Sequence, residues 1–172
     1  MTESEILSQP NHLAVKMFQK FARFEYALKA SGFYEGDKPP TGEKPAKPGW
    51  VKFSRVVADR LENPRTEQLK AAVNYICQTP PMQHVIKADG SLGWGIAKKN
   101  DSKAAVILLY VCQVRNNLFH GGKLETDGQW VISRVERSKL LIEHSLTILD
   151  ECLEACPKVK DAYNYTSQDF LG

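Results

Sequence analysis

The stretch 104–123, A-A-V-I-L-L-Y-V-C-Q-V-R-N-N-L-F-H-G-G-K, joins a long apolar run to a cluster of polar side chains and then to two glycines. Every residue of the run 104–111 is apolar, so a helix containing this run must be covered on several sides. The triplet N-D-S at 100–102 supplies N-cap residues before it. The sequence therefore predicts a central helix over residues 102–119, with other helices packed around it.

The segment before this central helix shows the same helical character. A first helix is predicted from Asn11 to Ser31, because asparagine is a good N-cap residue and Gly32 can end the helix. Its apolar residues recur every three or four positions and so share one face. They are Leu13, Met17, Phe21, Phe24 and Leu28.

Three more helices follow from similar spacings. A short helix is predicted from Trp50 to Leu61, before Asn63-Pro64, and another helix contains the apolar residues of segment 69–76 before Pro80-Pro81. A last long helix is predicted from about Ser133 to Cys156, where Pro157 ends it. The fold class expected is all-α, an up-and-down bundle of four to five helices.

The segments between and after these helices have other characters. Residues 35–49 are rich in proline and lysine and predict a long surface loop, either a solvated connector or a tether for RNA phosphates. Residues 82–97 contain a D-G turn between brief arms and favour a structured loop with a small hairpin. Residues 157–172 show no clear period and are expected to form a C-terminal tail.

Length and composition favour one domain over residues 1–172, with its core at about 11–156. The N-terminal segment carries acids and lacks the apolar region of a signal peptide, and no apolar stretch is long enough to cross a bilayer, so we expect a cytoplasmic protein without a membrane partner. The net charge of +3 neither requires nor excludes RNA binding. The four cysteines form no C-x-x-C pair and are expected to be buried free thiols, with no metal and no cofactor.

The polar cluster of the central helix resembles the signature of the HEPN superfamily. That signature is an arginine, usually followed by a polar residue, and a histidine four to six positions later, which Arg115, Asn116 and His120 match. The resemblance extends from about residue 11 to 156. It implies a helical bundle of HEPN type, a homodimer through the 102–120 helix, and a metal-independent endoribonuclease. It also implies a toxin–antitoxin or phage-defence setting, in which an antitoxin protein is a further partner.

These residue types suit RNA cleavage without a metal. The ribose 2′-OH must lose a proton, the phosphate must be held as charge develops, and the departing 5′-oxygen must gain a proton. The His120 imidazole transfers protons near neutral pH, and the planar Arg115 guanidinium can hold two phosphoryl oxygens. Five residues on a straight helix place two side chains about 140° apart, so either a second copy or a frayed last turn is needed to bring the two side chains together. We expect a second copy to complete the site.

Alternatives exist for each of these residues. Glu25 is expected either to orient Arg115 from the first helix or to face solvent, and Asn116 to support the site. Arg137 and His144 also satisfy a loose arginine–histidine spacing, but they lie within a continuous helix and are interpreted as structural. His120 and Arg115 themselves are structural in the alternative interpretation, a catalytically inactive HEPN-like bundle that binds protein or RNA.

Overall fold

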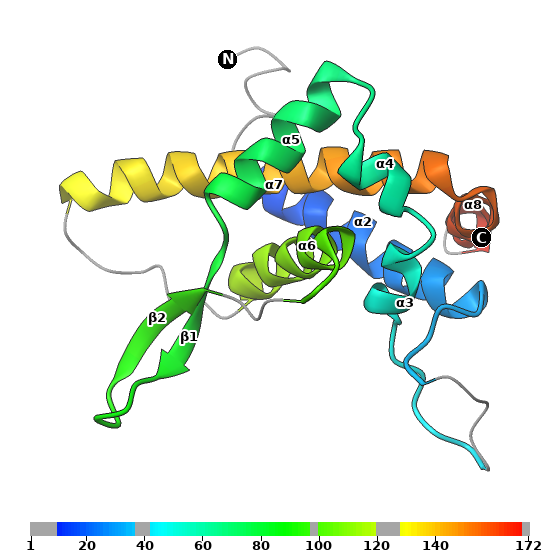
Figure 1. Ribbon diagram of the computed structural model, residues 1–172, viewed down its shortest axis with the longest axis horizontal. Helices are drawn as coiled ribbons and strands as arrows, with labels where there is room; N and C mark the ends of the chain where they lie inside the picture. The colour runs from blue at the N-terminus through cyan, green and yellow to red at the C-terminus, as the bar shows by residue number, and fades with distance from the viewer. Residues whose placement is uncertain (1–9, 37–41, 97–99, 120–127, 170–172) are drawn as a thin grey trace.

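The computed structural model describes residues 10–36, 42–96, 100–119 and 128–169. These residues form seven helices and one two-stranded sheet (Figure 1). The helices are α2 (Pro10–Ala30), α3 (Trp50–Ser54), α4 (Ala58–Glu62), α5 (Glu67–Gln78), α6 (Lys103–Phe119), α7 (Gly128–Ala155) and α8 (Pro157–Asp169), and the strands are β1 (Met82–Ile86) and β2 (Leu92–Ile96). The expectation of a largely helical fold is confirmed.

Helix α6 is the central helix of the bundle. It contacts α2, α3, α4, α5, α7 and the first strand, and every residue from Ala104 to Leu118 is buried or half-buried. Burial of its apolar side chains stabilises the fold because each one removes a large apolar area from water. The apolar run in the sequence therefore marks the element that the other helices enclose.

Helix α2 buries the face expected from its periodicity. Its five predicted core residues are all buried, and Phe24 stacks on Trp50 of α3 with ring centroids 5.3 Å apart. The helix ends where glycine permits it, since Gly32 has a φ of 82° and the N–H of Phe33 donates to the Leu28 carbonyl at 2.8 Å. The predicted end of this helix is confirmed to within one residue.

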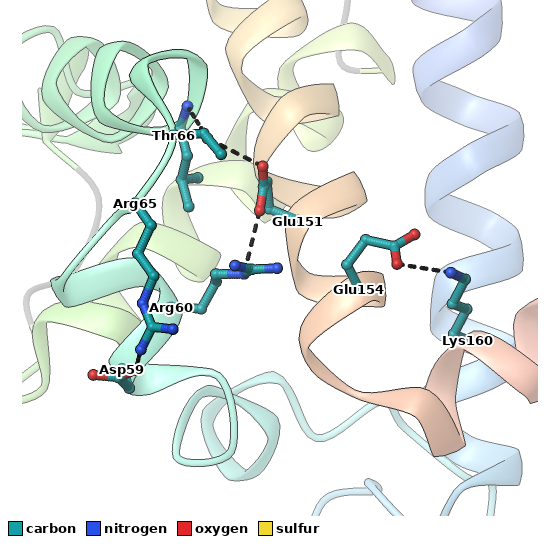
Figure 2. Close-up of polar contacts among 8 residues, drawn as sticks. Asp59, Arg60, Arg65, Thr66, Glu151, Glu154 and Lys160 are labelled. Carbon is teal, nitrogen blue, oxygen red and sulfur yellow. Dashed lines mark hydrogen bonds and ion pairs between the residues drawn. The ribbon is translucent and has the colours of Figure 1, made fainter.

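A corner between α4 and α5 is tied to α7 by polar contacts (Figure 2). Thr66 is the N-cap of α5, where its hydroxyl accepts from the Leu69 N–H at 3.2 Å and donates to Glu151 at 3.2 Å. The same Glu151 carboxylate pairs with Arg60 of α4, at 3.2 Å. One acidic side chain on α7 thus fixes two neighbouring elements.

The hairpin expected between residues 82 and 97 is present. Its strands are antiparallel, and their turn contains Gly90 with a φ of 82°. Asp89 stabilises the turn by accepting from the Ser91 N–H at 2.9 Å. The hairpin extends away from the helices (Figure 1), so most of its surface contacts no other element.

The sequence-based expectation was wrong at the C-terminal end. Residues 157–169 form helix α8 rather than a tail, and α8 packs against α2. Pro157 ends α7 and starts α8, because proline is well tolerated in the first turn of a helix. Val159, fully buried, and the partly buried Tyr163 provide the apolar contacts.

The expected number of helices, four to five, was also too low. In addition to α8, the helix expected over residues 50–61 is divided into α3 and α4 by a turn at 55–57. Helix α7 begins at Gly128, one turn earlier than the apolar period indicates. The start of α7 is an error at a helix end, where local sequence signals are weakest, whereas the turn at 55–57 and helix α8 were missed as elements.

The loop after α2 closes at its base. Tyr34 and Pro48 form an isolated β-bridge, and the N–H of Glu35 donates to the Lys47 carbonyl at 2.9 Å.

Among the described helices, none combines the length and apolar character needed to span a membrane.

Candidate functional site

Arg115 lies in the last turns of α6 and faces α2. Its Nη2 atom is 3.3 Å from Oε2 of Glu25, and its guanidinium carbon is 4.9 Å from the ring centroid of Phe21. A third contact comes from its own helix, where Nη1 donates to Oδ1 of Asn116 at 3.0 Å. The cation is therefore held by a carboxylate, an amide and an aromatic ring.

The spacing of α2 explains this arrangement. Phe21 and Glu25 are four residues apart, so they are neighbours along one side of the helix. Phe21 belongs to the buried stripe, whereas the Glu25 side chain is 25% exposed at its edge. The ring supports the guanidinium from below while the carboxylate pairs with it at the surface. Glu25 thus lies beside Arg115, which is one of the two alternatives expected for it.

The pair is only partly removed from water. The Arg115 side chain is 30% exposed. Ion pairs near the surface contribute little to stability, in general below about 1 kcal/mol, because solvent screens them and the side chains lose freedom. The arrangement orients the guanidinium more than it stabilises the fold.

Two more polar residues continue from this cluster to the hairpin. Asn117 donates from Nδ2 to the Met82 carbonyl at 2.7 Å and accepts from Gln113 at 2.8 Å. No role for Asn117 was predicted from the sequence. In the structure it connects the motif helix to the first residue of β1, on the side of α6 away from Arg115, because two residues turn a helix by about 200°.

The nearest thiol is unsuited to nucleophilic chemistry. Burial raises the pKa of Cys112, the nearby Glu25 carboxylate raises it further, and Arg115 opposes the shift without cancelling it. A thiol with a strongly raised pKa is protonated at neutral pH and reacts slowly. Cys112 therefore serves in packing.

The remaining predicted site residue, His120, lies outside the described residues, as do Gly121 and Gly122. Of the four predicted site residues, the structure brings together Arg115, Asn116 and Glu25.

The second arginine–histidine pair has structural contacts. Arg137 donates to the Pro80 carbonyl at 2.9 Å, next to the start of the hairpin. His144 packs against Tyr75, with ring centroids 4.7 Å apart, and burial lowers its pKa. The two side chains thus contact different parts of the α5–β1 segment. These contacts agree with the structural interpretation of both residues.

Sequence reasoning missed the role of Phe21 as the ring under Arg115, because its periodicity identified it only as a core residue. It also missed Asn117, whose partner is a backbone carbonyl 35 positions away. The role of Phe21 could have been found only from a predicted contact between α2 and α6. The role of Asn117 could have been found only from a predicted contact between α6 and the hairpin.

Within the described ranges, no group of three or more histidine, cysteine, aspartate or glutamate side chains is placed to hold a metal ion. No family model matches the sequence, and no match was found among curated proteins or among solved structures. The geometry around Arg115 and the sequence motif are therefore the basis for a functional proposal.

Proposed function

We propose that this protein is a metal-independent endoribonuclease of HEPN type, with Arg115 and His120 as catalytic residues and Asn116 and Glu25 in support. The site is composite and lies between two copies of the chain, as expected of a homodimer through the 102–120 helix. Its setting is a toxin–antitoxin or phage-defence system, in which an antitoxin protein is a further partner.

The observation that carries this proposal is the arrangement of Arg115. A guanidinium held on one side by Phe21 and at its nitrogens by Glu25 and Asn116 has a restricted orientation. Such preorganisation matters for transition-state stabilisation, because a cation that needs no reorientation loses no energy as charge develops. Arg115 also lies near the C-terminal end of α6, and His120 follows it closely in the sequence.

In the proposed reaction His120 transfers protons and Arg115 binds the phosphate. The imidazole of His120 in one copy takes the proton of the ribose 2′-OH, whose oxygen then bonds to the adjacent phosphorus. The bond from phosphorus to the 5′-oxygen breaks, and the protonated imidazole of the second copy gives its proton to that oxygen. Arg115 binds the phosphoryl oxygens throughout. The products are a 2′,3′-cyclic phosphate and a 5′-hydroxyl end.

The direct test is RNA cleavage by the purified protein in excess chelator. Wild type is expected to produce 2′,3′-cyclic phosphate ends, and His120→Ala and Arg115→Ala are expected to abolish them while the protein stays folded. His144→Gln is the matched control, since this histidine packs against Tyr75 and lies outside the motif. Equal cleavage by wild type and His120→Ala would contradict the catalytic assignment.

One observation favours a second function. Every contact just described for Arg115 also suits a purely structural residue that joins α6 to α2. The alternative is a catalytically inactive HEPN-like bundle that acts as a protein- or RNA-binding module. In that case RNA binding, measured by fluorescence anisotropy, persists in wild type without cleavage, and His120→Ala leaves it unchanged.

A further inference from the structure

A pocket of about 270 Å³ lies between the base of the loop after α2 and helix α3. Its walls come from residues 34–36, from residues 48–52 with Arg55, and from Leu109 of α6. Helix α3 lies on the opposite side of the bundle from the hairpin (Figure 1). The volume is slightly below the roughly 300–1,000 Å³ of pockets that enclose drug-sized ligands, so the pocket suits a smaller molecule.

The backbone wall of this pocket is fixed by the fold. Tyr34 and Pro48 form a β-bridge, and the Gly49 N–H donates to the Phe33 carbonyl at 2.8 Å. A Cβ atom at Gly49 would lie 2.9 Å from the carbonyl carbon and oxygen of Tyr34, which is closer than a side-chain carbon can approach. Glycine therefore allows the two backbone segments to meet. A ligand that binds against this wall does not have to order it first.

Two cations line the pocket from the same side of α3. Lys52 and Arg55 are three residues apart, and Arg55 keeps a helical backbone with φ −65° and ψ −33°, so the two side chains are neighbours. Neither forms an ion pair with another residue of the described ranges. The Lys52 ammonium lies 5.2 Å from the ring centroid of Tyr34, which holds it beside the pocket. Both charges are therefore available to an anion.

The rest of the lining is largely apolar. Val51 is 39% exposed, and Pro48 and Leu109 are half-buried. Glu35 contributes a carboxylate, so the two cations outnumber a single anion in the lining. Such a pocket matches a molecule that carries one anionic group on an apolar body.

We propose that this pocket binds a small organic anion. Its carboxylate or phosphate group pairs with Lys52 and Arg55, and its apolar or aromatic body packs against Val51 and Leu109. Hydrogen bonds from an arginine or lysine to such a group are stronger than those between neutral groups. The lining includes none of Arg115, Asn116 and Glu25, so this site is separate from the Arg115 cluster and does not rest on the proposed ribonuclease.

A small molecule fits this pocket better than RNA does. Single-stranded RNA is bound along a basic groove, with aromatic rings on which successive bases stack. The Trp50 ring of the pocket is only 7% exposed, because it stacks on Phe21 and Phe24 with ring centroids 5.0 and 5.3 Å apart. The exposed Glu35 carboxylate also repels a chain of phosphates. The pocket therefore suits a single anionic group.

The test is an NMR titration of the isotope-labelled full chain with phenyl phosphate and, separately, with benzoate. At least one of them is expected to cause saturable shifts of the amides of residues 34–36 and 49–52, with a dissociation constant of about 1 mM. The comparison between the two shows which anionic group the site prefers. Inorganic phosphate and phenol are expected to bind about 10-fold more weakly, because each lacks half of the contacts.

Three substitutions test the charges. Lys52→Gln and Arg55→Gln are each expected to raise the dissociation constant about 5- to 10-fold, because each removes a charged donor. Glu35→Gln is expected to lower it about 2- to 3-fold, because it removes a repelling carboxylate. A general loss of structure would not give opposite signs. Lys70→Gln is the matched control, since it removes a surface cation that pairs with Glu67 on α5 and is expected to change nothing.

Several results would overturn the proposal. These are the absence of saturable shifts with both probes, shifts centred on Arg115 and Glu25, and equal effects of Arg55→Gln and Lys70→Gln. Single-stranded RNA that shifts the pocket amides at a lower concentration than either probe overturns it in favour of RNA. An RNA cleavage assay separates the two proposals, because a chain that binds the probe in this pocket and never cleaves RNA contradicts only the ribonuclease.

Discussion

The guanidinium of Arg115 on α6 and the carboxylate of Glu25 on α2 lie 3.3 Å apart, although they are separated by 90 positions in the sequence. Phe21, one turn before Glu25, supports the same guanidinium at 4.9 Å. Helices α2 and α6 thus meet at the residue that the sequence motif singles out. This relationship gives the most direct prediction.

Replacement of Glu25 by glutamine keeps the size of the side chain and removes its charge. We expect the free energy of unfolding to change by less than about 1 kcal/mol, because the ion pair is partly exposed. RNA cleavage is expected to fall about 10-fold, because a less restricted Arg115 is misplaced for part of the time. Urea unfolding and a cleavage time course measure the two effects. Glu67→Gln is the control, since Glu67 pairs with Lys70 at the surface; equal cleavage by both variants would contradict a positioning role for Glu25.

His144 is expected to make the stability of the protein depend on pH. Burial against Tyr75 lowers its pKa below the ordinary value of 6.5, so the unfolded chain binds a proton that the folded chain resists. The free energy of unfolding therefore falls as the pH drops below about 6.5, and is unaffected by this group above it. Chemical unfolding at several pH values should show a smaller loss in His144→Gln than in wild type. Parallel curves for the two proteins would exclude this contribution.

Asn117 is expected to secure the hairpin to the bundle. Asn117→Ala removes the 2.7 Å bond to the Met82 carbonyl, and a hydrogen bond of this kind contributes about 0.5–1.5 kcal/mol. Hydrogen exchange of the β1 and β2 amides should become faster, with little change in α5 or α7. Asn63→Ala provides the comparison, because the Asn63 side chain donates to the exposed Asp59 carboxylate at 3.1 Å, far from the hairpin in sequence. Unchanged exchange in the hairpin would show that other contacts suffice.

Helix α8 is expected to be part of the core. Val159 is fully buried, and Val159→Ala should lower the free energy of unfolding by about 1–3 kcal/mol through lost apolar contact and a residual cavity. Tyr165→Ser, on the same helix and 67% exposed, should change it by less than about 0.5 kcal/mol. Urea titrations of the three proteins decide the point. If Val159→Ala behaves like Tyr165→Ser, α8 contributes little to folding.

Features that depend on residues close together in the sequence were predicted correctly, and features that depend on distant residues were missed. The buried stripe of α2, the end of that helix at Gly32 and the enclosed central helix were predicted well, because each depends on residues within a few positions. The division of segment 50–61 and the helix at 157–169 were missed, since neither has a strong local period. Val159 is fully buried on α8, and α8 packs against α2, which lies more than a hundred positions earlier.

By itself, the sequence determined which segments form helices, which faces they bury and which polar residues form a motif, because periodicity and capping act locally. The tertiary structure alone decided that Phe21 and Glu25 meet Arg115, that Asn117 holds the hairpin, and that large apolar side chains of the hairpin remain exposed. These features depend on how whole elements pack. Packing joins residues far apart in the chain through contacts that no local pattern encodes.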